Sequence, residues 1–130
     1  DSDDIPESPV GHITSGLSCR GVVLTCVEDT YDRETDSGTL GAIQLRFFEP
    51  HRTFFLNYGR SISVINEGER WRFDCGGGDP FPFEDVERYK ARRVRDRFTR
   101  EMLVDYLLAL GIDAFSRDFY GPRCALFQPP

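Results

Sequence analysis

The hydrophobic and polar positions along the chain change their period once, at a glycine-rich stretch about two thirds of the way along. Before it, short segments run apolar or alternate with a period of two, as strands do. After it, apolar residues recur every three to four positions, as in amphipathic helices. The stretch itself, residues 75–83 (CGGGDPFPF), holds three glycines and two prolines, which interrupt both kinds of element. The sequence therefore predicts a sheet followed by a helical region.

Five segments before the glycine-rich stretch have the composition of β-strands. They are rich in β-branched or aromatic residues, and most alternate apolar with polar side chains. Their ranges are 21–28, 42–48, 53–58, 61–65 and 70–75. The last two flank Asn-Glu-Gly-Glu at 66–69, a sequence typical of the turn in a β-hairpin. In the second arm Trp71, Phe73 and Cys75 share the face that is expected to point into the core.

Two helices are expected after the glycine-rich stretch. The first covers 84–98, where apolar side chains recur along one stripe and several basic ones lie opposite. The second covers 100–110, with Thr99 suited to be its N-cap and Gly111 its terminator. The side chains expected to form the buried face of this second helix are Met102, Leu103, Tyr106, Leu107 and Leu110.

The predicted fold is α+β: a curved antiparallel sheet of five to six strands in the N-terminal two thirds, followed by two to three C-terminal helices packed on it. Residues 113–120 could form the third helix, and 123–127 a last strand or an extended tail. A small barrel closed by a helix is the alternative. At 130 residues the chain suits one domain. We expect that domain over 11–130, after a flexible acidic arm at 1–10.

Charge is distributed unevenly along the chain. The net charge is −6, yet residues 88–100 hold seven basic side chains and one acidic one. On the predicted helix, Arg88, Arg92 and Arg95 form a ridge opposite the apolar stripe. The ridge could be a solvated face held by ion pairs, in part to the acidic loop 28–36, or a docking site for an acidic protein. An anion or RNA site is the third reading, and nucleic acid is disfavoured because the total charge is negative.

The second predicted helix is apolar nearly all round. Val104 and Leu108 lie next to Glu101, on the side expected to face water. Either the C-terminal segment covers them or they form an exposed patch for a partner. The candidate protein-binding surface therefore combines this patch with the basic ridge, and its residues are Arg88, Arg92, Arg95, Val104 and Leu108.

Paired aromatic residues point to a second possible site. Phe-Phe occurs at 47–48 and at 54–55, so one ring of each pair faces away from the core side of the sheet. The sheet is then either covered on both faces or curled around a small cavity able to hold an apolar ligand. The residues expected near the mouth of that cavity are His51, Tyr58 and Trp71.

No catalytic or metal-binding motif stands out, and no cofactor or metal site is predicted. The only histidines, His12 and His51, do not combine with cysteines at a metal-ligand spacing. Four cysteines in 130 residues are not disulfide-dense, which favours a cytoplasmic over a secreted protein only weakly and leaves the thiol state open. No apolar run approaches the length that crosses a membrane.

These observations favour a non-catalytic protein-interaction domain, regulatory or of the inhibitor or immunity type, acting through a protein partner. A small-molecule-binding protein or enzyme that uses the concave sheet face is the first alternative. Anion or RNA binding by the arginine-rich helix is the second. The sequence does not indicate an oligomeric state.

Overall fold

The computed structural model describes residues 9–53 and 55–117. In chain order its elements are α1 (Pro9–Leu17), β1 (Gly21–Val27), β2 (Ala42–Phe48), β3 (Tyr58–Asn66), β4 (Trp71–Gly76), the 3-10 turns η1 (Arg88–Lys90) and η2 (Val94–Asp96), and α2 (Arg100–Ala109). The strands form one antiparallel sheet in the order β1-β2-β3-β4. The α+β class is thus confirmed, with four strands and two α-helices in the described residues instead of five to six strands.

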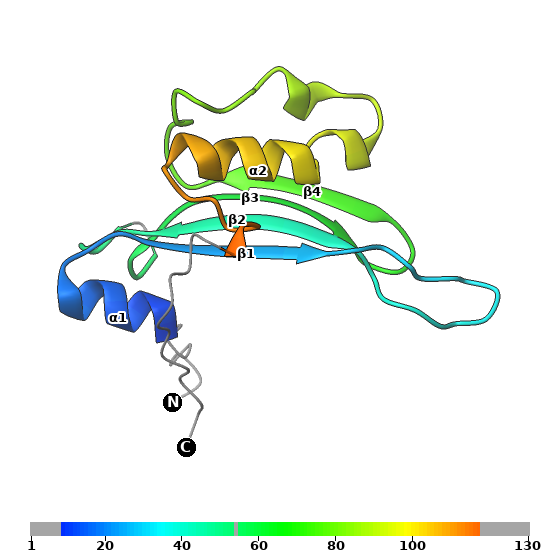
Figure 1. Cartoon of the computed structure of the whole chain (residues 1–130), viewed down its shortest axis with the longest axis horizontal. Helices are drawn as coiled ribbons and strands as arrows, with labels where there is room; N and C mark the ends of the chain where they lie inside the picture. Colours follow the sequence, from blue (N-terminus) through cyan, green and yellow to red (C-terminus); the bar gives the residue numbers. More distant parts are fainter. Residues whose placement is uncertain (1–8, 54, 118–130) are drawn as a thin grey trace.

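The sheet is a meander in which each strand pairs with the next one along the chain, and it is visibly curved (Figure 1). The pairing aligns Leu24 with Leu45, Leu45 with Ile62, and Ile62 with Cys75. Because side chains alternate between faces, this row and its neighbours two residues away form one apolar face. The helix α2 lies over that face and α1 lies on the other side of the sheet (Figure 1).

The core lies between this apolar face and α2. Leu103, Tyr106 and Leu107 contribute the buried side of α2, with Met102 and Leu110 partly buried beside them, as the helical periodicity predicts. The remaining buried members of the cluster come from the sheet and from the residue before the N-cap of α2: Leu45, Phe47, Ile62, Val64 and Phe98. Removing their apolar surface from water is the main stabilising contribution to this packing.

Both ends of α2 carry the caps that the sequence predicts. The Thr99 side chain accepts a hydrogen bond from the backbone N–H of Met102. At the other end Gly111 adopts φ +79°, which brings its N–H to the carbonyl of Leu108 and the Ile112 N–H to the carbonyl of Leu107. This pair of bonds is a Schellman motif.

The predicted strand 53–58 is wrong, whereas the predicted strand 61–65 lies within β3. Leu56 has φ +48°, and the Thr53 N–H donates to the Leu56 carbonyl, so the chain turns tightly at this point and does not extend. The strand β3 then begins at Tyr58 and continues without a break to Asn66. The predicted strand 53–58 therefore contributes only Tyr58 to the sheet, and this accounts for four strands before the glycine-rich stretch where five are predicted.

The helix α1 is not among the elements that the sequence pattern predicts. Residues 1–8 of the predicted arm lie outside the described part, and Pro9 and Val10 already belong to α1. The amide of Asn57 fastens α1, donating to the Gly11 carbonyl at 2.8 Å and the Thr14 hydroxyl at 2.9 Å. The helix thereby covers one end of the second sheet face.

The predicted helix over 84–98 is also wrong. Two single 3-10 turns, η1 and η2, are separated by extended backbone at Ala91 and Arg93. Arginine side chains bind backbone carbonyls of this segment: Arg97 donates to the Ala91 carbonyl, and Arg88 to that of Asp96. Tertiary contacts have replaced the local helical bonds, so the helical wheel did not place the basic residues correctly.

The C-terminal predictions are tested only in part. Within 113–117 the Ser116 N–H donates to the Asp113 carbonyl in a turn. The rest of the predicted helix 113–120 and the predicted strand 123–127 lie outside the described residues. None of the helices in residues 9–53 and 55–117 is long and apolar enough to cross a membrane.

Candidate functional site

A pocket of about 730 Å³, here named the sheet-end pocket, opens where β1 ends, β2 and β4 begin, and α2 starts. Its apolar lining comes from the sheet and from Phe115 after α2, with a half-buried thiol, Cys26, among the aliphatic side chains. Its charged lining comes from the loop after β1, from the segment around η2 and from Arg100 at the start of α2. The lining residues are Cys26, Val27, Glu28, Asp29, Ala42, Ile43, Val64, Trp71, Arg93, Arg95, Asp96, Thr99, Arg100 and Phe115.

Two arginines of the sheet-end pocket lie over aromatic rings. The guanidinium carbon of Arg95 is 4.4 Å from the centroid of the Trp71 ring, and that of Arg100 is 4.5 Å from the centroid of Phe115. Each contact is a cation–π interaction, worth about 0.5–1 kcal/mol at an exposed position. Within the described residues, neither guanidinium has a hydrogen bond or an ion pair. Their N–H donors are therefore available to a ligand.

Two of the three carboxylates of the sheet-end pocket, Asp29 and Asp96, have partners within the chain. Asp29 accepts hydrogen bonds from the Asn66 amide at 2.9 Å and the Gly41 N–H at 2.8 Å. These bonds, with a smaller contribution from the charge of Arg95, hold the pKa of Asp29 below its usual value despite some burial. The Asp96 carboxylate lies 3.9 Å from Arg93.

The structure separates the residues of the predicted basic ridge. Arg95 reaches the sheet-end pocket, Arg88 donates to the carbonyl of Asp96, and Arg92 is exposed outside the pocket lining. Val104 is half-buried and Leu108 is 50% exposed on α2, and neither lines the pocket. The two residues that the structure brings together are Arg95 and Trp71, which the sequence pattern assigns to different sites.

The residues proposed for a cavity on the concave face are likewise not assembled. Trp71 pairs with Asn66 at one end of the sheet, while Tyr58 begins β3 at the other end. Tyr58 borders a shallower depression of about 410 Å³, where the guanidinium carbon of Arg46 is 5.8 Å from its ring centroid. His51 is exposed in the loop between β2 and β3.

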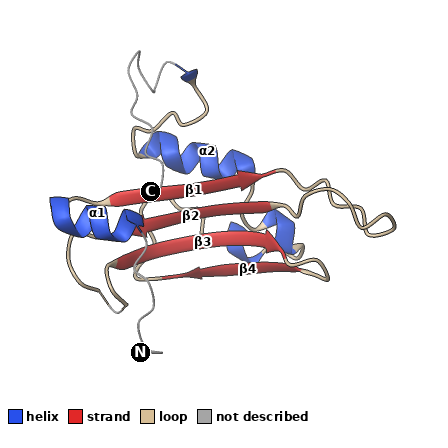
Figure 2. Cartoon of the chain, turned by 90° about the horizontal axis from the view of Figure 1, so that it is seen from below, coloured by secondary structure: helices blue, strands red, loops and turns tan. Residues whose placement is uncertain are grey.

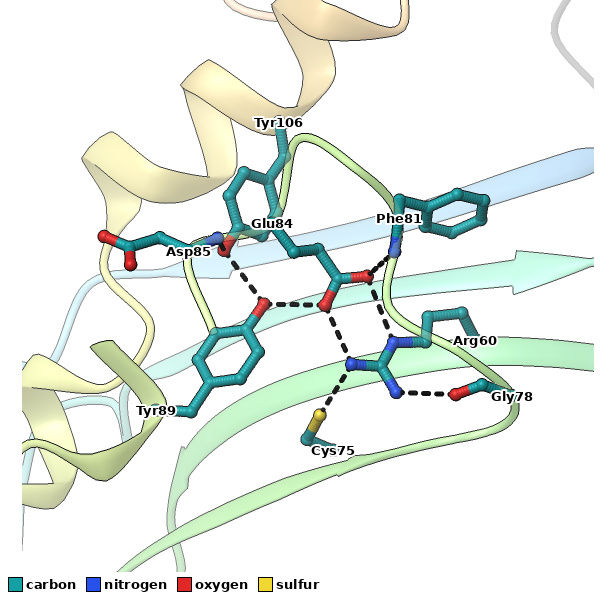
Figure 3. Close-up of polar contacts among 8 residues, drawn as sticks. All are labelled: Arg60, Cys75, Gly78, Phe81, Glu84, Asp85, Tyr89 and Tyr106. Carbon is teal, nitrogen blue, oxygen red and sulfur yellow. Dashed lines mark hydrogen bonds and ion pairs between the residues drawn. The ribbon is translucent and has the colours of Figure 1, made fainter. Parts of the chain in front are cut away.

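A buried ion pair that the sequence pattern does not predict lies beneath the glycine-rich stretch (Figure 3). The Arg60 guanidinium donates to Glu84 twice, from Nη2 to Oε1 at 2.8 Å and from Nε to Oε2 at 3.1 Å. The side chains are 6% and 0% exposed. Arg60 also donates to the Gly78 carbonyl and to the Cys75 sulfur.

Glu84 receives two further hydrogen bonds, from the Tyr89 hydroxyl at 2.9 Å and the Phe81 N–H at 2.7 Å (Figure 3). With four donors its carboxylate is saturated, so it holds the fold and is not available as a general base. The Tyr106 hydroxyl lies 2.9 Å from that of Tyr89 and accepts from the Asp85 N–H. Burial raises the pKa of both tyrosines.

One feature of the sequence could have revealed this network. Arg60 has the same parity in β3 as Ile62 and Val64, which places a guanidinium on the apolar face of the sheet. A buried cation requires a carboxylate partner. The helical period instead assigns Glu84 to the start of a helix, as a surface partner of Arg88.

No group of three or more His, Cys, Asp or Glu side chains suited to a metal ion occurs in residues 9–53 and 55–117. Cys19, Cys26 and Cys75 are free thiols, and Cys124 lies outside the described residues. No protein-family model matches the chain, and neither a curated protein nor a solved structure resembles it significantly.

Proposed function

We propose that the protein is a non-catalytic binding domain for a protein partner and that the sheet-end pocket is its recognition site. The partner segment carries a carboxylate next to an apolar side chain. The observation that supports this proposal is the stacking of Arg95 on Trp71, at 4.4 Å, in the wall of the pocket.

The chemistry of the pocket matches such a segment. Tryptophan and arginine are the residues that most often dominate the binding energy of protein interfaces. The stacked guanidinium of Arg95 keeps its N–H edge free for a carboxylate, which it can hold through two parallel hydrogen bonds. Val27, Ile43 and Val64 offer an apolar surface beside it.

A small anionic ligand is the second candidate. A volume of about 730 Å³ lies within the range of roughly 300–1,000 Å³ that is usual for small-molecule pockets. An aromatic carboxylate could stack on Trp71 and contact Arg95 and Arg100 at once. This candidate uses the same residues and differs only in that the pocket binds a small molecule and not a segment of a protein.

The fluorescence of Trp71, the only tryptophan in the chain, reports directly on the pocket. We would select binders from a displayed library of random 12-residue peptides and titrate them while following this fluorescence. We expect selected peptides to contain Asp or Glu beside an aromatic or aliphatic residue. Arg95→Ala should weaken their binding about 30-fold, the loss typical of an interface hot spot.

Arg92→Ala is the matched control, since Arg92 is an exposed arginine of the same segment outside the pocket lining. Equal binding by Arg95→Ala and Arg92→Ala, or selected peptides without acidic residues, would refute the proposal. If no peptide binds but benzoate quenches Trp71 in an Arg95-dependent way, the small-molecule candidate replaces it.

A further inference from the structure

The two edges of the sheet differ in how they are protected against pairing with another strand. The edge strand β4 carries Arg72 and Asp74 in its middle and turns into a glycine-rich stretch. The other edge strand, β1, reads Gly-Val-Val-Leu-Thr-Cys-Val, with no charge and no proline. Within residues 9–53 and 55–117, this uncharged β-branched edge of seven residues pairs with no strand on its outer side, and it is suited to accept a further strand.

We propose that β1 pairs with β1 of a second copy of this chain, so that two four-stranded sheets join into one of eight strands around a two-fold axis at Leu24. The charges that flank β1 support this partner. Arg20 precedes the strand and Glu28 follows it, each four residues from Leu24. Antiparallel pairing about Leu24 therefore sets Arg20 of each copy opposite Glu28 of the other.

The same charges fix the register. A slip by two residues would place Arg20 opposite Cys26 or Thr30 and Glu28 opposite Ser18 or Val22, so both ion pairs would be lost, and a slip by one would put the two faces of the strand out of phase. In the Leu24-centred register Val22 faces Cys26 of the other copy, on the side that carries α2. Val22, Leu24 and Cys26 are each only half-buried in the single chain, although they already pack against the core.

The exposed flank of α2 lies on the same side of the molecule. Viewed from the α1 side, α2 runs along the β1 side of the sheet, away from β4 (Figure 2). Tyr106 points toward Tyr89 and the segment that covers β3 and β4. Successive helical residues turn by about 100°, so Val104 and Leu108 lie on the opposite flank of the helix from Tyr106. Phe115 already lies over Arg100, one turn before Val104 on this flank, so the contact between the two copies is made by the β1 edges and not by the α2 flanks.

The Nε atom of Arg20 already lies 3.3 Å from Oε1 of Glu49, which follows the neighbouring strand β2, and half of the Arg20 side chain is exposed. The proposed pairing adds a second carboxylate to this guanidinium and does not require the first to leave. One guanidinium can bind both carboxylates because its five N–H donors point in several directions. The contact is isologous: each copy contributes the same strand.

The first test is the molar mass of the full chain by sedimentation equilibrium between about 1 and 200 µM, which we expect to change from monomer to dimer across about this range. Glu28→Arg sets like charges opposite each other in two symmetric places and should weaken dimerisation about tenfold. The charge-exchanged variant Arg20→Glu/Glu28→Arg, combined with Glu49→Gln so that no like-charge pair forms within the chain, should recover it. A mass that stays monomeric throughout, or a dimer indifferent to Glu28→Arg, overturns the proposal.

A second test does not depend on charge. In Val22→Cys, mild oxidation with oxidised glutathione should join the introduced thiol to Cys26 of the other copy and give a covalent dimer, since directly opposed residues lie within disulfide reach. Val23→Cys places the new thiol on the other sheet face and is the matched control. Equal cross-linking in both variants would refute the proposed register. Protected β1 amides in a monomer would show that something other than a second copy covers this edge.

Discussion

The buried pair between Arg60 and Glu84 allows a quantitative test of how burial changes the contribution of an ion pair to the free energy of unfolding. Glu84→Gln keeps the shape of the side chain but removes its charge, leaving the guanidinium of Arg60 at 6% exposure without an anion. The substitution also replaces one carboxylate oxygen by an NH2 group, which cannot accept hydrogen bonds from the donors that face it. Loss of one partner of a buried pair costs about 3–5 kcal/mol, against a total stability of about 5–15 kcal/mol for a domain.

The surface pair between Arg72 and Asp74 is the matched control. Its nitrogen and oxygen are 2.7 Å apart, marginally closer than the 2.8 Å of the buried pair, but both side chains are more than half exposed. Asp74→Asn makes the same kind of change in water, where such pairs contribute about 0–1 kcal/mol. Distance alone predicts equal effects, whereas burial predicts a large difference.

Urea unfolding followed by the fluorescence of Trp71 would measure both effects. With a slope of about 1.5 kcal/mol per molar urea, Glu84→Gln should lower the midpoint by about 2 M or more, and Asp74→Asn by less than about 0.7 M. The double variant Arg60→Met/Glu84→Leu should be less destabilised than the sum of its two single changes. A loss below about 1 kcal/mol for Glu84→Gln would refute the reasoning.

Three further outcomes follow from the same region of the structure. Stability should fall as pH rises above about 10, because the pKa of Tyr89 and Tyr106 is raised in the folded state and the unfolded chain releases those protons first. Thermal unfolding between about pH 9 and 11 tests this, and Tyr89→Phe should flatten the slope. Gly77→Ala should cost more than about 1–2 kcal/mol, because φ is +88° and a Cβ would collide with the Gly59 carbonyl oxygen, whereas Gly76→Ala, next to open space, should cost little. Urea midpoints of the two variants compare them. Cys75 is exposed as a residue, but partial desolvation of its sulfur raises its pKa, with Arg60 opposing in part, so Cys75 should react with iodoacetamide at about pH 8 more slowly than an unperturbed thiol, as peptide mass spectrometry can measure.

The sequence predicted those elements whose pattern is local. The hairpin around 66–69 and the helix after Thr99 carry their own turn residues, caps and periodicity, and both formed as expected. The segment 84–98 also has a helical period, but the pairing of Glu84 with Arg60 connects residues 24 positions apart. No local pattern encodes that contact, and it overrides the weak helical preference of the segment.

Of the residues that the sequence analysis singles out as site residues, only Arg95 and Trp71 line the sheet-end pocket. Arg95 and Trp71 were both singled out, but on separate surfaces, because a helical wheel for 84–98 points Arg95 away from the sheet. The extended backbone at Arg93 redirects the chain, and Arg95 then lies on the Trp71 ring. Arg100 and Phe115 were not singled out, since nothing in their local sequence indicates that their side chains meet.

The meander connectivity of the sheet has a consequence for the order of folding. Because β1, β2, β3 and β4 each pair with the next strand along the chain, every sheet contact closes a short loop, and the loss of chain entropy at each step is small. Arg60 and Glu84 can be buried together only after the segment that follows Gly76 has packed on the sheet. We expect the hairpins to form first and the docking of α2 to be the later, slower event.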